Sequence, residues 1–374
     1  MGPDLSNDAA HPLEQRFGAA VSRTARRGRA GPARAFVGQV SASAASQRPD
    51  VSVIVVTHQG REVVLDVLGA AYAATGPIEV EWLVVDSGST DGTPDAIERE
   101  FPGIEVLRAP NIGFAAGNNV ALGRARGRYL LLLNPDVEIA AGTLAQLVAA
   151  MDERPGVGIA SSLTHYPDGV LQTTMRRFPS PARQLGEALM LNRLPGFRHL
   201  QEDETRPELY EAERDADWLS GSFLLARREA VEQAGGLDER FFLFSEETDW
   251  CLRIRAAGWE IRHVPCLRLV HHTGRSERPD LYAQNSYSKV LYARKHFSPA
   301  ARAGFRAALA LRHGLRCALF LSRALRRREL RERAAAERLA LLVVLGVKRP
   351  RYRPYAGSVR VEPDSAHREI GAAS

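Results

Sequence analysis

The apolar run VSVIVVTH (51–58) has the length of one β-strand and shows no alternation of polar and apolar residues. Runs of this kind are typical of strands that are buried on both faces of a parallel sheet. Further strand-like runs alternate with helical patterns, at 61–74, 80–86, after Thr93, 104–108, 115–126, 128–134, 142–152 and near 157–163. This repetition predicts right-handed βαβ units and therefore a parallel sheet.

The alternation stops at residue 165. Residues 165–216 are polar and interrupted by Pro, which predicts an excursion or a lid and not a second core. WLSGSFLLARREA (218–230) predicts a strand that leads into a helix. EETDWCLRIRAAG (246–258) predicts a helix, and two short strands follow it. From Pro279 to Lys348 the pattern is helical.

These patterns divide the chain into segments at 1–49, 50–278, 279–350 and 351–374. The first is rich in Ala, Arg, Ser and Gly without an apolar stripe, which predicts disorder. The second predicts an α/β domain with a mostly parallel central sheet and helices on both faces. The third predicts a basic helical extension, and the last a tail.

The 374 residues are 45% hydrophobic and 25% charged, which excludes collagen-like, wholly disordered and disulfide-stapled chains. The net charge of +6 is unevenly distributed. Residues 300–353 contain 15 Lys or Arg and three acidic residues, whereas residues 50–299 have a net charge of −9. This acidic body argues against a nucleic-acid partner.

Three features bear on the compartment. No apolar run reaches the roughly 18 to 20 residues of a membrane-spanning helix, and no signal peptide opens the chain. The 3 Cys have neither pairing nor metal-like spacing, which fits a reducing compartment. We therefore expect an intracellular protein.

Polar residues follow the predicted strands at their carboxyl ends, where ligands of parallel sheets bind. DSGSTDGT (86–93) places Asp86 at a strand end, ahead of a helix that Asp91 and Thr93 can cap. The segment is either a well-capped turn or part of a nucleotide pocket, in which Asp86 accepts a hydrogen bond from a base or ribose. The sequence has no GxGxxG in a βα turn and no GxxxxGK[ST], which argues against a dinucleotide-binding Rossmann site and a P-loop.

NPDVE (134–138) ends the most apolar strand. An Asp at the exit of a buried strand must face solvent, a ligand or a metal, because burial of an isolated carboxylate is costly. Asn134 and Asp136 lie on the same side if the chain stays extended. Their oxygens suit Mg²⁺ or Mn²⁺, which bridge to substrate phosphates. The alternative is a simple turn that terminates the strand.

Two further segments contain titratable residues. In FFLFSEETDW (241–250), the carboxylates of Glu246, Glu247 and Asp249 follow bulky aromatic residues. They either complement the dipole at a helix N-terminus or include a carboxylate with a raised pKa that serves as a general base. HHTGRS (271–276) follows an apolar run; its His residues are structural or belong to a site for metal-assisted group transfer.

In this order, the segments resemble the family 2 glycosyltransferases, especially the rhamnosyltransferase-like branch that acts on bacterial cell-surface glycans. The resemblance covers about residues 51–275 and implies a Rossmann-like fold of the GT-A type. It rests on VSVIVVTH, VVDSGSTDGT, NIGFAAGNN (111–119), LLLLNPDVE, WLSGSFLLARREA, GGLDERFFLFSEETDWCLR and VHHTGRS.

The resemblance implies a nucleoside-diphosphate sugar donor and a divalent cation. The residues that it places around the donor are Thr57, Asp86, Ser87, Asn111, Gly113, Phe114, Asn118 and Asn134, with Trp218, Ser220 and Gly221 facing the donor sugar or the acceptor. Asp136 stands at the last position of the family's Asp-x-Asp motif and would bind Mg²⁺ or Mn²⁺, whereas Asn134 replaces the first Asp. His271, or His272 one position later, would complete the metal shell.

The family's catalytic base is usually the Asp of a Glu-Asp pair. Here the pair is Glu246–Glu247, so the resemblance places the base at Glu247, with Asp249 as a rival. The base would take a proton from an acceptor hydroxyl as its oxygen attacks the anomeric carbon opposite the leaving nucleoside diphosphate, which inverts that centre. We expect an inverting glycosyltransferase with dTDP-rhamnose as the first choice of donor and a UDP-linked sugar as the second.

Within 302–328, apolar and cationic residues fall on separate helical arcs. These residues are Leu311, Leu315, Ala318, Leu321 and Leu325 on one arc and Arg302, Arg312, Arg316, Arg323 and Arg327 on the other. The pattern is typical of a helix in a membrane interface; ordinary packing with a solvated Arg face is the alternative. We expect contact with anionic lipid on the cytoplasmic face of the plasma membrane, where a glycan or polyprenyl-diphosphate-linked acceptor would be reached.

Two other functions stay open. One is a nucleotidyltransferase of the same fold, although His58–Gly60 is a poor substitute for the Gly-rich, Lys-containing loop that such enzymes normally show. The other is a non-catalytic protein that binds a membrane or a nucleic acid through the Arg-rich extension.

Overall fold

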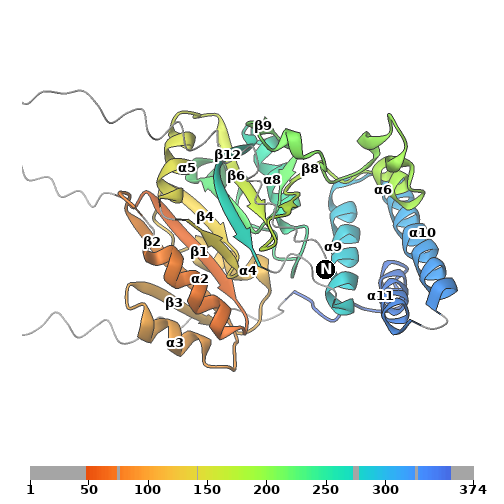
Figure 1. Ribbon diagram of the computed structural model, residues 1–374, viewed down its shortest axis with the longest axis horizontal. Coiled ribbons are helices and arrows are strands. Elements are labelled where there is room, and N and C mark those ends of the chain that lie inside the picture. The colour runs from red at the N-terminus through yellow and green to blue at the C-terminus, as the bar shows by residue number, and fades with distance from the viewer. Residues whose placement is uncertain (1–47, 74–75, 141, 273–277, 325–326, 355–374) are drawn as a thin grey trace, which may run out of the picture. The chain divides into compact units, whose positions relative to one another are not determined.

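The computed structural model describes residues 48–354 except 74–75, 141, 273–277 and 325–326. Most of the segment 1–49, for which we predicted disorder, and most of the tail therefore lie outside the described residues. Leu325 and the last four residues of HHTGRS lie outside them as well. A ten-stranded sheet is ordered β3-β2-β1-β4-β11-β6-β12-β5, with β7 paired to β6 and β9 paired to β12 (Figure 1). A second, two-stranded sheet joins β8 and β10.

The predicted alternation of strands and helices is confirmed. The strands are β1 (Val51–Thr57), β2 (Val80–Ser87), β3 (Ile104–Ala109), β4 (Tyr129–Leu133), β5 (Val137–Ile139), β6 (Val157–His165), β7 (Leu171–Gln172), β8 (Met175–Arg176), β9 (Arg214–Asp215), β10 (Trp218–Leu219), β11 (Phe223–Arg227) and β12 (Glu260–His271). The α-helices are α2 (Arg61–Ala73), α3 (Thr93–Glu100), α4 (Phe114–Leu122), α5 (Thr143–Asp152), α6 (Pro181–Ala188), α7 (Arg228–Ala234), α8 (Glu246–Ala256), α9 (Pro279–His296), α10 (Pro299–Arg323) and α11 (Arg328–Val344). Three short 3₁₀ turns lie between α6 and β9, namely η1 (Leu191–Arg193), η2 (Arg198–Leu200) and η3 (Pro207–Leu209).

The main sheet is mostly parallel, as predicted. β1 pairs in parallel with β2 and with β4, and β2 pairs in parallel with β3. β11 enters between β4 and β6 and runs antiparallel to both. The start of β11 therefore lies at the carboxyl end of β4, where Phe223 is the register partner of Leu133. This reversal places the loop before β11 at the edge where ligands of the parallel strands bind.

The two short strands predicted after α8 are one strand, β12, with a register irregularity between His263 and Arg268. The hydroxyl of Ser162 spans the irregularity, because it donates to Val264 O at 2.6 Å and accepts from Leu267 N at 3.0 Å. One side chain thus replaces the ladder bonds that the bulge interrupts, and a strand that looks broken in the sequence stays continuous.

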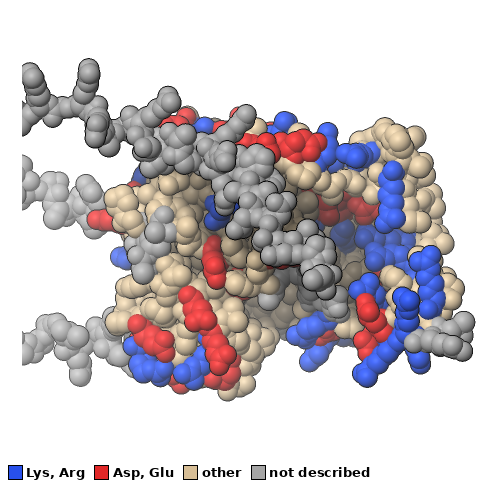
Figure 2. All heavy atoms as spheres, in the orientation of Figure 1, with Lys and Arg blue, Asp and Glu red and all other residues tan. Residues whose placement is uncertain are grey.

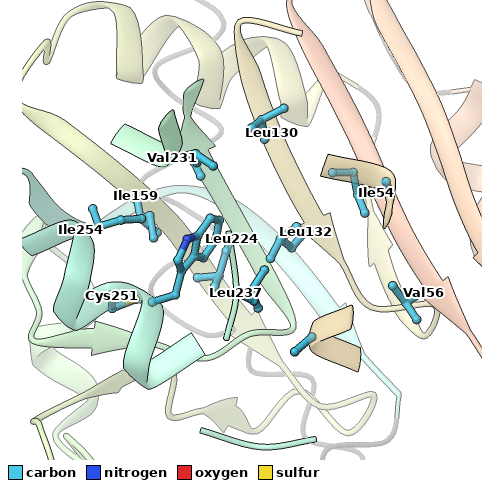
Figure 3. Packing of buried hydrophobic residues seen from close by; sticks show 14 of the residues in the cluster. Ile54, Val56, Leu130, Leu132, Ile159, Leu224, Val231, Leu237, Cys251 and Ile254 are labelled. Carbon is cyan, nitrogen blue, oxygen red and sulfur yellow. The ribbon is translucent and has the colours of Figure 1, made fainter. Parts of the chain in front are cut away.

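Both faces of the sheet are covered, which explains the unbroken apolar run of β1. Ile54 and Val56 pack on the side of α4, α7 and α8, and Figure 3 shows this cluster around Leu132 and Leu224. Val53 and Val55 pack on the opposite side, with α2, α3 and α5. Alternate residues of one strand therefore serve two separate cores, and neither set can be polar.

The polar stretch 165–216 forms the predicted excursion. It contains the small β8–β10 ladder, α6 and the 3₁₀ turns, and α6 packs against α10. The helical pattern that begins at Pro279 forms α9, α10 and α11, which share a small core of Val290, Ala293, Phe305, Leu309 and Val344. None of the described helices is both long and apolar enough to cross a bilayer.

Candidate active site

The carboxyl ends of β1, β2 and β3 bring four of the predicted donor residues together. Thr57 is the register partner of Asp86. Asn111 follows β3, and its Nδ2 lies 3.3 Å from His58 Nε2. The other ring nitrogen of His58 lies 2.8 Å from the carbonyl oxygen of Ser87. The loops after these strands are thus joined at one edge of the sheet.

Three of these side chains have buried polar atoms without partners. Thr57 Oγ1, Asp86 Oδ2 and Ser87 Oγ make no hydrogen bond to any of the described residues. The other carboxylate oxygen of Asp86 accepts from Ser89 N at 3.0 Å. Each buried group without a partner costs about 1–3 kcal/mol, so native structures leave few of them. Three at one strand edge indicate a place that receives hydrogen bonds from a ligand.

The loop after β3 packs against the aromatic run that precedes α8. Gly113 has a φ of 88°, and a side chain there would overlap Phe242. Phe114 N donates to Phe242 O at 2.7 Å. Asn118 is directed inward, and its Nδ2 donates to Phe114 O at 2.8 Å within α4. The loop after β3 is thereby fixed to the segment that precedes α8.

Asp136 and His271 lie side by side. His271 ends β12 opposite Val137, and its Nε2 lies 3.3 Å from Asp136 Oδ1. Its Nδ1 lies 2.9 Å from Gln172 Oε1, which can only accept, so Nδ1 donates. In a neutral imidazole, Nε2 then directs its lone pair toward the Asp136 carboxylate. Two electron-pair donors held this close suit a shared divalent cation.

The donor set at this position is small. Among the described residues, no group of three or more His, Cys, Asp and Glu is arranged to hold a metal ion. Mg²⁺ and similar ions commonly take one or two protein ligands and complete their shell with water and substrate phosphates. Asp136 and His271 fit that mode of binding, which needs a phosphate-bearing ligand nearby.

His271 and His272 were both candidates from the sequence, and the structure separates them. His272 Nε2 lies 2.6 Å from Glu138 Oε1, on the side of the strand away from Asp136. Only its backbone N–H reaches Asp136, donating to the carbonyl oxygen at 3.0 Å. Asn134 is held by its backbone N, which donates to Ser222 O at 2.9 Å.

The start of α8 is strained and closely packed. Phe244 and Ser245 have φ values of 69° and 68°, in a region that residues other than Gly seldom adopt. Glu247 lies against Gly221, where a Cβ would be 3.4 Å from Glu247 Cβ. Ser222 Oγ, Glu246 Oε2 and Glu247 Oε2 are buried and have no partner among the described residues. The start of α8 therefore has buried polar atoms without partners among the described residues, as the ends of β1 and β2 do.

The two glutamates differ in the charges around them. Burial raises the pKa of Glu246, and repulsion by Glu247 raises it further. Burial also raises the pKa of Glu247, but backbone N–H groups and the positive charge of Arg176 oppose the rise. Both carboxylates thus have a higher proton affinity than an exposed carboxylate, and the charge of Arg176 opposes the rise at Glu247.

Asp249 has a saturated environment. Its side chain is fully buried and receives Arg253 Nε at 2.8 Å, Lys295 Nζ at 2.6 Å and His296 Nε2 at 2.7 Å. Burial raises the pKa of Asp249, but hydrogen bonds from His296, Lys295 and Arg253 outweigh it and hold the pKa below its usual value. These contacts tie α8 to α9.

The indole of Trp218 also has partners within the protein. Its Nε1 donates to Arg177 O at 3.0 Å, and the Arg176 guanidinium lies 5.0 Å from the ring centroid. The indole therefore fastens the excursion to the loop that contains Ser220 and Gly221. The roles of Trp218 and Ser220 toward a sugar stay predictions.

Three residues around the site were not singled out from the sequence. Gln172 orients His271, and the charge of Arg176 acts on Glu247. Both lie in the polar stretch 165–216, whose pattern has no periodicity. Ser222 follows the predicted Gly221 directly, and its only signal is membership of the stretch WLSGSFLLARREA.

Comparisons with known proteins agree with this geometry. A family model described as Glycosyl transferase family 2 matches residues 52–233. The N-acetylglucosaminyl-diphospho-decaprenol L-rhamnosyltransferase of Mycobacterium tuberculosis is 33% identical over 223 residues, which cover 56% of this chain and 71% of that protein. The rhamnosyltransferase WbbL of Escherichia coli K12 is 23% identical over 190 residues, covering 48% of this chain and 68% of that protein.

The fold has a solved counterpart. The mannosyltransferase PcManGT of Pyrobaculum calidifontis, in complex with GDP-Man and Mn²⁺, is similar with a TM-score of 0.50 and 21% identity, covering 81% of this chain and 89% of that chain. This likeness confirms the predicted fold of the GT-A type. The chain is therefore a glycosyltransferase and belongs to glycosyl transferase family 2.

Proposed function

We propose that this glycosyltransferase moves L-rhamnose from dTDP-rhamnose to a hydroxyl of a polyprenyl-diphosphate-linked glycan, with inversion at the anomeric carbon. Two of the similar proteins are rhamnosyltransferases, which supports rhamnose as the sugar that is transferred. The name of one of them includes a decaprenol-linked acceptor, which supports a lipid-linked acceptor here. The observation that carries the proposal is the set of buried polar atoms without partners at the strand ends and at the start of α8.

The donor would bind along the carboxyl ends of β1 to β4. The Asp86 carboxylate and the hydroxyls of Thr57 and Ser87 would bond to the nucleoside, replacing partners that the described residues do not supply. Asn111 adjoins this group through His58. Asp136 and His271 would hold Mg²⁺ or Mn²⁺, which when bound neutralises negative charge on the diphosphate leaving group.

Glu247 would act as the general base. Its carboxylate takes the proton of the acceptor hydroxyl while the acceptor oxygen forms a bond to the anomeric carbon. The bond from that carbon to the diphosphate oxygen breaks, and the nucleoside diphosphate leaves with the electron pair. A raised pKa suits this task, because a base must be ionised before the reaction and hold a proton after it.

The surroundings of Asp249 favour Glu247 over its rival. Arg253, Lys295 and His296 occupy the Asp249 carboxylate, and their hydrogen bonds lower its proton affinity. Gly221 has no side chain, so its backbone can lie close to Glu247. The space that a side chain would fill there would be available to an acceptor. Ser222 follows Gly221, and its hydroxyl would form a hydrogen bond to the sugar or the acceptor.

A lipid-linked acceptor would place the enzyme at an anionic membrane surface, on the cytoplasmic face. The three cysteines, Cys251, Cys266 and Cys317, are all free thiols, which supports a reducing compartment.

A donor panel tests the proposal. The purified enzyme is incubated with a polyprenyl-diphosphate-linked acceptor and with dTDP-rhamnose, UDP-glucose or UDP-N-acetylglucosamine, each with Mn²⁺ or EDTA. We expect nucleoside-diphosphate release from dTDP-rhamnose with Mn²⁺, and a product of inverted anomeric configuration by NMR. Turnover of a UDP-linked sugar alone would replace the donor, and a retained configuration would rule out the single displacement.

A further inference from the structure

Large apolar side chains lie exposed along a short part of the excursion. Between 43% and 53% of each is accessible, in α6 and at positions that flank the turns η1 and η2: Leu185, Leu189, Met190, Leu194 and Phe197. Single exposed hydrophobic residues are normal on a protein surface, whereas a contiguous group marks a contact surface. We call these five side chains the apolar rim.

The apolar rim belongs to a well-packed element. Gly186 in α6 approaches Leu200 so closely that a side chain at 186 would overlap it. Glu202 N donates to Glu187 Oε1 at 2.9 Å, and Arg183 Nη1 donates to Phe178 O at 2.7 Å. The exposure of the rim therefore results from how the excursion folds, because its polar side chains are turned inward to hold it together.

The neighbouring helix α10 extends the same surface. The Cβ of Pro181 lies 3.9 Å from the Cβ position of Gly304, and Glu187 Oε2 lies 2.8 Å from Arg312 Nη1. α6 thus runs along α10 in the same direction. α10 exposes three leucines at spacings of four residues, which share one face of the helix: Leu311, Leu315 and Leu319.

A hollow lined by arginines lies next to the rim. It has a volume of about 710 Å³ and is lined by Asn192, Arg193, Arg198, Gln201, Thr205, Arg206, Pro207 and Glu208. Arg206 is paired with Glu204 at 2.8 Å, whereas Arg193 and Arg198 form no salt bridge to the described residues. These two arginines flank Leu194 and Phe197 of the rim in the sequence. Cationic and apolar groups are thus neighbours in this part of the excursion.

The arginines predicted on α10 are used differently from the expectation. Arg312 pairs with Glu187, and Arg316 Nε lies 2.7 Å from Glu337 Oε1. Figure 2 shows further cationic side chains over α10 and α11. Arg312 and Arg316 of α10 therefore form ion pairs with the excursion and with α11. The arginines near the rim that form no salt bridge to the described residues, Arg193 and Arg198, come from the excursion.

We propose that the excursion and α10 dock on a bilayer that contains anionic phospholipid, with the apolar rim in the membrane interface and lipid phosphates in the arginine hollow. Guanidinium groups bind phosphate oxygens bidentately, and apolar side chains flanked by cations are typical of interfacial segments. The purpose of the docking rests on the proposed function, because it would bring a lipid-linked acceptor to the enzyme.

Vesicle flotation tests this docking. The full chain is mixed with vesicles of phosphatidylcholine, or of phosphatidylcholine with phosphatidylglycerol, at low and high salt. We expect binding to the anionic vesicles alone, weakened by salt. The variants Arg193→Ala with Arg198→Ala, and Leu194→Glu with Phe197→Glu, should each bind at least tenfold more weakly. The matched control, Arg331→Ala with Arg338→Ala on α11, removes the same charge from exposed positions and should bind within about threefold of wild type.

The outcomes separate docking from catalysis. Each variant is first checked by thermal unfolding and by dTDP binding without vesicles, and both should match wild type. Equal loss in the control variant, or equal binding to neutral vesicles, would overturn the proposal. A Leu194→Glu and Phe197→Glu variant that changes oligomeric state but still floats would also overturn it and would identify the rim as a protein contact. Failure of dTDP binding in wild type contradicts the proposed function and leaves the vesicle result standing.

Discussion

Glu247 and Asp249 lie two residues apart on α8, and the structure surrounds their carboxylates in opposite ways. Glu247 Oε2 is covered but has no hydrogen-bond partner among the described residues. The Asp249 carboxylate contacts the side chains of Arg253, Lys295 and His296, two of them from α9. The pKa of Glu247 is raised, and that of Asp249 is lowered. Several of the buried polar atoms without partners gather at the candidate site, whereas the partners of Asp249 join α8 to α9.

The helical extension supplies a second saturated cluster. Ser286 Oγ lies 3.0 Å from His313 Nε2, and His313 Nδ1 lies 2.7 Å from Glu337 Oε2, in the order of a catalytic triad. Glu337 also accepts from Tyr282 and Arg316. Every buried polar side-chain atom of this cluster has a partner among the described residues, whereas Glu247 Oε2 has none. The comparison therefore assigns it to the joining of α9, α10 and α11.

Replacement of the proposed base should have the largest effect. Glu247→Gln keeps the size of the side chain but cannot accept the acceptor proton, so we expect kcat to fall by about 10³-fold. The melting temperature should stay within about 2 °C of wild type, because the amide oxygen of Gln can accept from the same backbone N–H groups. Initial rates at saturating donor and a thermal melt measure both quantities. A loss of less than tenfold would remove Glu247 from the mechanism.

The same carboxylate should control the pH dependence. Because burial raises the pKa of Glu247, the base becomes protonated as the pH falls through a value above the ordinary range for glutamate. We expect kcat to decline about tenfold per pH unit below that point, with the acid limb above about pH 4.5. A pH–rate profile with an acid limb at or below that value would contradict a raised pKa.

Loss of the metal pair should have the next largest effect. Asp136→Asn and His271→Ala each remove one ligand, and we expect about 10²-fold lower kcat/KM and weaker activation by Mn²⁺. His272→Ala serves as the control, because its ring contacts Glu138. The control should stay within about threefold of wild type. EDTA should abolish wild-type transfer, and transfer that continues in EDTA would contradict the assigned roles.

Asp249→Asn should affect stability more than chemistry. Removing one partner from a buried charge cluster costs about 3 kcal/mol, because the remaining cations lose their counterion. The free energy of unfolding, from urea titration, measures this loss, and the folded fraction should retain most of its kcat.

The pH dependence of that stability has a definite sign. A lowered pKa of Asp249 contributes stability that is present above the pKa of the unfolded chain and is lost as the pH falls through the folded value. Asp249→Asn should therefore flatten the acid limb of the stability curve. Urea titrations at several acidic pH values measure the limb, and an unchanged slope would show that other carboxylates set it.

Trp218→Phe should have the smallest effect. It removes the hydrogen bond to Arg177 O, which is worth about 1 kcal/mol of stability. We expect kcat/KM to stay within about threefold of wild type, measured with dTDP-rhamnose. A change in kcat of tenfold or more, with stability unaltered, would contradict this expectation and support the predicted role of Trp218 at the sugar.

The strands and most helices could be predicted because their patterns are local. Continuous apolar runs such as 51–58 announce burial on two faces, and β1 has that environment. The segments around Asp86, Asp136 and Glu247 were also found, since each lies at a strand end or a helix start. The sequence could not rank Glu247 against Asp249, because Lys295 and His296 come from a helix more than 40 residues later. Gln172 and Arg176 escaped notice since a polar stretch has no period that reports its tertiary contacts.

Titration calorimetry of dTDP, with Mn²⁺ and with EDTA, tests the central claim most directly. That claim is that the partnerless atoms at the carboxyl ends of the strands receive a nucleoside diphosphate beside Asp136 and His271. The account predicts binding in Mn²⁺ that is at least tenfold weaker in EDTA, in Asp86→Ala and in Asp136→Asn. Equal affinity under all four conditions, or no binding of either dTDP or UDP, would contradict it.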